Sequence, residues 1–209
     1  MTEKTQMNRF FKKAVIFVLP LLVCYACKVE MDNSFFENAE DQRTIEKVKA
    51  WYAAHQPEEI NINSPDGTSR AEMKAVWSHA FVTKNENYEV VETDLMSKVW
   101  ISYVDSACMA KYNETNDPKY KLCYTRLVFR TNLETKDTVG FLMTFVPNLE
   151  WLEKSNFKPF IGITYLDRSK PFGGAILFHN LDGSFSNGWR YDNGKIVSKI
   201  MSLNVNPNQ

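Results

Sequence analysis

The chain has 209 residues, of which 44% are hydrophobic, 13% aromatic and 24% charged, with 25 basic and 25 acidic side chains. This composition is too polar for a multi-span membrane protein and too rich in apolar and aromatic residues for a disordered one. The balanced charge argues against a protein that binds nucleic acid by neutralising phosphates, so no nucleic-acid partner is expected.

The first 26 residues have the pattern of an export signal. The basic residues Arg9, Lys12 and Lys13 precede an apolar run over residues 14–26. This run is shorter than the roughly 20 apolar residues that a membrane-spanning helix needs, and it has the size of a signal-peptide core. We therefore expect residues 1–26 to be a signal peptide.

The signal ends in a sequence that indicates a lipid anchor. Ala26 directly before Cys27 resembles the lipobox of bacterial lipoproteins, in which the cysteine is lipidated and becomes the new N-terminus. Cys24 stands where a lipobox usually has Leu or Val, so the match is partial, and the alternative is an ordinary cleaved signal peptide. With lipidation at Cys27, we expect residues 27–40 to be the lipid anchor and tether and residues 41–209 to form a single domain. The anchor would hold the protein in the cell envelope, at the outer membrane.

Two cysteines remain in the expected domain, Cys108 and Cys123. An exported chain meets an oxidising compartment, where an even pair of cysteines favours a disulfide. The bond would close a segment, residues 109–122, that is rich in turn-forming residues. The alternative is two separate buried thiols.

Two helices are expected at the start of the domain, over residues 41–55 and from Ser69 onward. The first has Asp41 as its N-cap, and residues 69–72 have the pattern of a capping box. Apolar residues then recur at helical spacing. The two stripes are Ile45, Val48 and Tyr52, and Met73, Val76, Trp77 and Ala80.

From residue 88 onward the pattern changes to strands rich in Val, Ile, Phe, Tyr and Thr, joined by short polar connections. Asp182-Gly183 and Asn193-Gly194 are hairpin signals, and short connections require antiparallel neighbours. The chain thus predicts an α+β fold, with N-terminal helices packed on a curved antiparallel meander of about seven or eight strands. The expected strands are residues 88–92, 99–105, 120–131, 138–146, 160–166, 174–179, 184–191 and 195–201, with a short helix capped by Asn148 over residues 148–154.

Several stretches together resemble a group of Bacteroidetes lipoproteins to which no activity is assigned. They are Trp77-Ser78-His79-Ala80, Tyr165-Leu166-Asp167-Arg168, Phe172-Gly173-Gly174, and Asn187-Gly188-Trp189-Arg190-Tyr191 followed by Asn193-Gly194-Lys195. With the lipobox-like start, this resemblance implies an envelope or surface lipoprotein with an acyl anchor such as palmitate. It implies no reaction.

The chain contains no glycine-rich phosphate loop, no H-E-x-x-H zinc motif and no G-x-S-x-G nucleophile elbow, and we expect no cofactor and no metal. A thiol nucleophile would need one of the two domain cysteines beside His79 or His179, which competes with the disulfide. A glycosidase would need two facing carboxylates. Its candidates are Asp94, Asp105, Asp167 and Asp182, most of which stand in turn-like contexts.

Aromatic residues near the end of the chain suggest a binding surface. Trp189 and Tyr191 share one face of an expected strand, and His179 ends another. Such a surface could hold a flat apolar ring or a sugar ring. The sequence therefore favours a non-enzymatic binding or structural module whose partner is a protein or glycan. The alternatives are an envelope hydrolase acting on glycan or peptide, and a secreted enzyme inhibitor.

Overall fold

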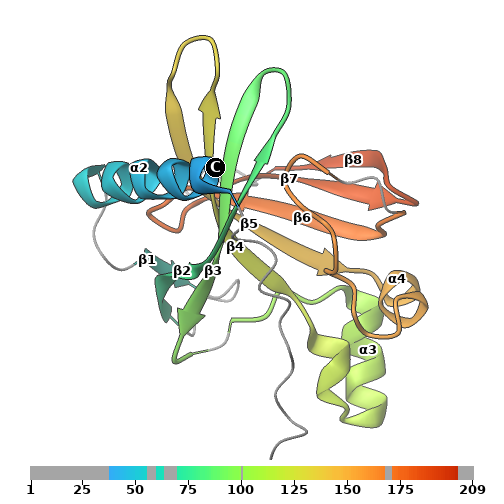
Figure 1. Ribbon diagram of the computed structural model, residues 1–209. Coiled ribbons are helices and arrows are strands. Elements are labelled where there is room, and N and C mark those ends of the chain that lie inside the picture. The colour runs from blue at the N-terminus through green and yellow to red at the C-terminus, as the bar shows by residue number, and fades with distance from the viewer. Residues whose placement is uncertain (1–37, 56–59, 64–69, 100, 168–170, 202–209) are drawn as a thin grey trace, which may run out of the picture. The chain divides into compact units, whose positions relative to one another are not determined.

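The structure is a computed structural model that describes residues 38–55, 60–63, 70–99, 101–167 and 171–201 (Figure 1). The chain divides into two units, Met1–Glu37 and Asn38–Gln209, and the described residues belong to the second. The predicted signal peptide and the lipidation site at Cys27 lie outside the described residues.

The second unit is built on one eight-stranded sheet in which every strand is antiparallel to its neighbour and the strands follow chain order. Helix α2 precedes the sheet, so the predicted α+β fold with an antiparallel meander is confirmed. The elements are α2 (Ala39–His55), β1 (Ile60–Asn63), β2 (Arg70–Lys84), β3 (Tyr88–Ser97), α3 (Ser106–Thr115), η2 (Pro118–Lys121), β4 (Tyr124–Asn132), β5 (Thr138–Pro147), α4 (Leu149–Lys154), β6 (Gly174–His179), β7 (Phe185–Asp192) and β8 (Lys195–Ile200).

Helix α2 covers one face of the sheet, which we call the α2 face. The predicted stripe is the buried one, because Ile45, Val48 and Tyr52 all enter the core there. The ring of Phe129, from β4, is fully buried beneath the helix, 5.6 Å from the ring of Tyr52. The charged residues of α2 are not buried, as expected for a helix with one apolar side, and Thr44 is the one polar residue of the helix that is buried.

The second predicted helix is wrong, because residues 70–84 form strand β2. Ala71 and Met73 are buried with one exposed residue between them, which is the period of a strand. The pairing register between β2 and β3 then shifts, and this bulge brings Trp77 and Ala80 into the same core cluster although they are three residues apart. The bulge therefore mimics the spacing of a helical stripe.

Residues 155–167, which we call the covering segment, place Phe160, Ile163, Tyr165 and Leu166 on the opposite face of the sheet, together with Phe172. A strand was predicted at residues 160–166, and this prediction is wrong, because the segment runs through turns. Ile163 is nevertheless fully buried in this second core. The apolar pattern marked a segment that buries side chains without joining the sheet.

The stretch between β3 and β4 also differs from the prediction. Residues 99 and 101–105 form no strand in the described chain, and the expected loop over residues 109–122 contains α3 and η2. Asp105 is the N-cap of α3 and accepts a hydrogen bond from the backbone N–H of Ala107, and β4 begins only after η2. The predicted short helix α4 and its cap at Asn148 are confirmed.

The hairpins at the end of the chain match the prediction closely. Strands β6, β7 and β8 follow one another in antiparallel pairs. The turns use Gly183 (φ 84°) and the pair Asn193 and Gly194 (φ 46° and 75°), all in the left-handed region that Gly and Asn tolerate best.

Candidate functional site

A hollow of about 400 Å³ opens on the side of the sheet opposite α2. Strands β4 to β7 contribute Arg130, Phe141, Phe178 and Trp189 in that order, and the covering segment contributes Tyr165. These strands are neighbours in the meander, so one residue from each lines the same hollow. The four residues span 60 positions of the chain. We call this site the aromatic hollow.

The rings form a connected set. Phe141 lies 5.7 Å from Phe178 and 5.3 Å from Tyr165, measured between ring centroids. Trp189 is two residues from Asn187, the partner of Phe178 in the β6–β7 ladder, so strand alternation places it on the same face. Ring faces and edges in such tilted arrangements stabilise one another and leave a shaped apolar wall.

The polar lining consists of neutral groups and one cation. Asn180, Ser186 and Asn187 line the hollow and offer amide and hydroxyl groups. Arg130 donates from Nη1 to the hydroxyl of Tyr165 at 3.1 Å, and its guanidinium lies 4.8 Å from the centre of the Tyr88 ring. Two neutral aromatic residues therefore hold this cation in place.

A buried ion pair positions the covering segment and so positions Tyr165. Glu92 is 0% exposed and accepts from Nη1 of Arg126 at 3.1 Å and from the backbone N–H of Tyr165 at 2.7 Å. The same Nη1 donates to the carbonyl of Ile163 at 2.6 Å. Burial disfavours the charged guanidinium, but the Glu92 carboxylate and Tyr124 together outweigh this, and the pKa of Arg126 is raised.

The structure separates the three residues of the predicted binding surface. Trp189 lines the aromatic hollow, and His179 contributes to its edge at the end of β6. The His179 ring itself packs against Tyr103 and Phe185 and is 3% exposed, and burial lowers its pKa. Tyr191 is buried against Phe172 and lies outside the lining of the hollow.

Both domain cysteines are buried free thiols, which corresponds to the second of the two alternatives drawn from the sequence. Cys108 donates to the carbonyl of Pro147 and Cys123 to that of Ile101, each with a distance of 3.7 Å. Burial raises the pKa of Cys108 to about 11 and also raises that of Cys123, so both thiols hold their protons. The predicted disulfide is not formed in this structure.

The histidines considered for thiol catalysis have other partners. His79 Nδ1 lies 2.8 Å from Oδ2 of Asp94, whose other oxygen accepts the hydroxyl hydrogen bond of Tyr124. Burial, together with this hydrogen bond, raises the pKa of Tyr124 to about 12. His179 Nε2 lies 3.2 Å from the hydroxyl of Tyr103. Asp94 thus links β2, β3 and β4 through its hydrogen bonds with His79 and Tyr124.

The other glycosidase candidates occupy local backbone positions. Asp105 caps α3, and Asp182 accepts from both the N–H and the hydroxyl of Ser184 within the β6–β7 turn. Asp167 lies in the covering segment, where its carbonyl accepts from Thr164. Each of the four carboxylates belongs to a different element. Across the described ranges, no group of three or more His, Cys, Asp or Glu side chains could hold a metal ion.

A second hollow, of about 560 Å³, lies between α3 and the ends of β5 to β8. Its wall is mostly apolar, with Leu177 and Ile200 from the strands and Met109 from α3. It contains the opposite charges of Arg190 and Asp105, so it favours neither sign of ligand charge.

Comparison with protein-family models, with curated proteins and with solved structures finds no match for this chain. In the part of the chain that the structure describes, no helix is both long and apolar enough to cross a bilayer.

Most of the aromatic hollow was missed from the sequence. Arg126 and Arg130 stand four residues apart in β4, on either side of the apolar residues 127–129, and this spacing places both on one face. This pattern was a usable signal for buried or functional cations. Phe141, Phe178 and Tyr165 gave no such signal, because aromatic residues in strands usually fill a core.

Proposed function

We propose that this chain is a non-enzymatic binding module of the cell envelope that holds a sugar ring in the aromatic hollow. The observation that carries the proposal is the convergence of Trp189, Tyr165 and two phenylalanines with Arg130 in one open hollow. Its volume of about 400 Å³ lies within the range of small-ligand sites, about 300–1,000 Å³.

The lining matches the surface of a sugar. Pyranose rings present C–H groups that pack on aromatic faces, and hydroxyl groups that need both donors and acceptors. The rings of Phe141, Phe178 and Trp189 supply the faces, while Asn180 and Asn187 supply amides that both donate and accept. Such groups bind and orient a ligand, which supports a binding role for the hollow.

A binding test follows from the position of Trp189. Replacing Trp189 with Ala should weaken the binding of a recognised oligosaccharide by about tenfold or more, because an aromatic stacking face is lost. Isothermal titration against neutral and acidic oligosaccharides measures this. Arg190→Ala is the matched control, because Arg190 is the next residue on β7 and lines the second hollow instead. Unchanged affinity in Trp189→Ala, or loss only in Arg190→Ala, would contradict the proposed site.

We also propose that the module is attached to the membrane through lipidated Cys27. The support is the sequence pattern of a basic segment, an apolar run and Ala26 before that cysteine. In the native host, Cys27→Ser should move the protein from the membrane fraction to the soluble fraction. Cys24→Ser is the matched control and should stay with the membranes. Membrane retention of Cys27→Ser would count against the anchor.

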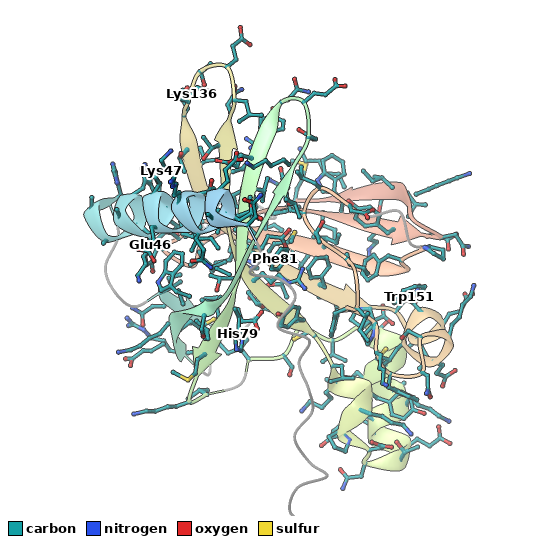
Figure 2. The ribbon with its side chains drawn as sticks, viewed as in Figure 1. Glu46, Lys47, His79, Phe81, Lys136 and Trp151 are labelled. Carbon is teal, nitrogen blue, oxygen red and sulfur yellow. The ribbon has the colours of Figure 1, made fainter. Side chains whose placement is uncertain are left out.

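The two hairpins β2–β3 and β4–β5 favour a second candidate, an inhibitor that inserts them into a partner enzyme. They extend side by side beyond α2, with Lys136 at one tip, and the N–H of Leu133 donates to the carbonyl of Asn87 at 2.9 Å (Figures 1 and 2). Their tips, residues 85–87 and 133–137, carry no Trp, Tyr or Arg, the residues that dominate most protein interfaces. The aromatic hollow is therefore the better supported site.

A further inference from the structure

We infer that the ligand of the aromatic hollow is an acidic sugar, whose ring carboxylate pairs with Arg130. This inference rests on the proposed function and names the class of sugar. It follows from the charges of the groups that line the hollow and from the neutral partners that hold the Arg130 guanidinium.

Two arginines on the same face of β4 have different partners. Arg126 is 11% exposed and is paired with the buried carboxylate of Glu92 at 3.1 Å. Arg130 donates to the neutral hydroxyl of Tyr165 and stacks on the neutral ring of Tyr88. Among the residues that the structure describes, no carboxylate lies within 4.0 Å of the Arg130 guanidinium. Within the described residues, the fold therefore pairs the charge of Arg126 with a carboxylate and leaves the charge of Arg130 without one at the hollow.

The rest of the lining adds no negative charge. Its described members are aromatic, aliphatic, amide or hydroxyl residues, with His179 at the edge and no Asp or Glu. A guanidinium has five N–H donors in a planar fork, which suits the two oxygens of a carboxylate. Tyr165 uses one of the two terminal nitrogens, and Tyr88 fixes the plane of the group. The remaining donors are oriented before a ligand arrives, which lowers the entropy cost of binding.

The second hollow provides an internal comparison. There Arg190 shares the lining with the acidic residue Asp105, so the second hollow carries side chains of both charges. The aromatic hollow combines the Arg130 guanidinium, which no described carboxylate approaches, with four aromatic rings and two amides. A sugar ring that carries a carboxylate satisfies all three kinds of group at once: the ring packs on the aromatic residues, the hydroxyls meet the amides and the carboxylate meets Arg130.

The test compares acids with their neutral esters. Trimers of galacturonate, glucuronate and mannuronate are titrated into the full chain by calorimetry, each beside its fully methyl-esterified form. We expect at least one acid to bind about 10- to 100-fold more tightly than its ester, the range of a hydrogen bond to a charged group. The preference should shrink as sodium chloride is raised, because the pair is only partly buried.

Substitution of the arginine gives a second readout. Arg130→Met should remove the preference for the acid over its ester, whereas the matched control Arg190→Met should keep that preference. Equal binding of acids, esters and neutral oligosaccharides by the unmodified protein would overturn the inference and leave the proposed function standing. Binding of no saccharide in any form would overturn the proposed function itself. The acid–ester comparison uses the unmodified protein, so it still tests the inference if Arg130→Met fails to fold.

Discussion

Replacing Arg126 with Met is expected to lower the free energy of unfolding by about 3–5 kcal/mol, the usual cost of removing one partner of a buried ion pair. The variant leaves the carboxylate of Glu92, which is 0% exposed, without its cation. It also removes the donor to the carbonyl of Ile163. Urea unfolding followed by tryptophan fluorescence measures the loss, which should appear as a lower midpoint.

The same substitution should also weaken ligand binding, because Glu92 fixes the backbone of Tyr165 at the aromatic hollow. Replacing both partners, Glu92→Leu with Arg126→Met, should recover much of the stability, since no unpaired charge remains buried. Lys111→Met, which breaks an exposed pair with Glu114, is the control and should leave the midpoint unchanged. A wild-type midpoint in Arg126→Met would show that the ion pair does not hold the covering segment.

Phe129→Ala is the second substitution with a large expected effect, a loss of about 3–5 kcal/mol. The Phe129 ring is 0% exposed and contacts three other rings: Trp51 at 6.0 Å, Tyr52 at 5.6 Å and Trp77 at 5.8 Å. Truncation opens a cavity between α2 and the sheet and removes these ring contacts. Chemical unfolding and the near-ultraviolet circular dichroism of the tryptophans should both report it.

Phe129→Leu serves as the matched variant, because it keeps most of the buried volume and loses only the ring. Its loss of stability should be clearly smaller than that of Phe129→Ala. Neither variant should change the affinity for an oligosaccharide, since Phe129 faces α2 and the hollow lies on the opposite face. A Phe129→Ala protein that unfolds at the wild-type midpoint would contradict the packing of α2 on this face.

The sequence predicted the class of fold because its strongest patterns were local. Asp182-Gly183 and Asn193-Gly194 require positive φ angles, which the structure shows at Gly183, Asn193 and Gly194. The stripe of α2 is uninterrupted, so its period is read directly. Patterns of this kind depend on a few neighbouring residues and do not need knowledge of the tertiary structure.

The errors arose where tertiary structure overrides a local pattern. In β2 a bulge changes the spacing of buried residues from two to three, which imitates a helix. In the covering segment, Ile163 is buried like a strand residue, but its carbonyl accepts from Arg126 and the next peptide pairs with Asp167. Helix α3 was missed because Cys108 is the one residue of its described span that is buried.

The candidate site was harder to predict than the fold. Trp189 was singled out because it shares one face of an expected strand with Tyr191, and it lines the aromatic hollow. Arg130 was not singled out. Its role as a site residue depends on its having no carboxylate partner among the described residues. That property is visible only when Glu92 is seen to pair with Arg126, 34 residues away in the chain. Long-range pairing of this kind leaves no mark on a local stretch of sequence.

The most direct test of binding in the aromatic hollow is a map of backbone amide chemical shifts during titration with an acidic oligosaccharide. The largest changes should fall on residues 139–141, 178–180, 186, 187 and 189, which line the hollow from three adjacent strands and the turn after β6. Residues 102–106, beside the second hollow, should change little. Shifts concentrated at those residues or at the hairpin tips, with residues 139–141, 186, 187 and 189 unmoved, would contradict a ligand site in the aromatic hollow.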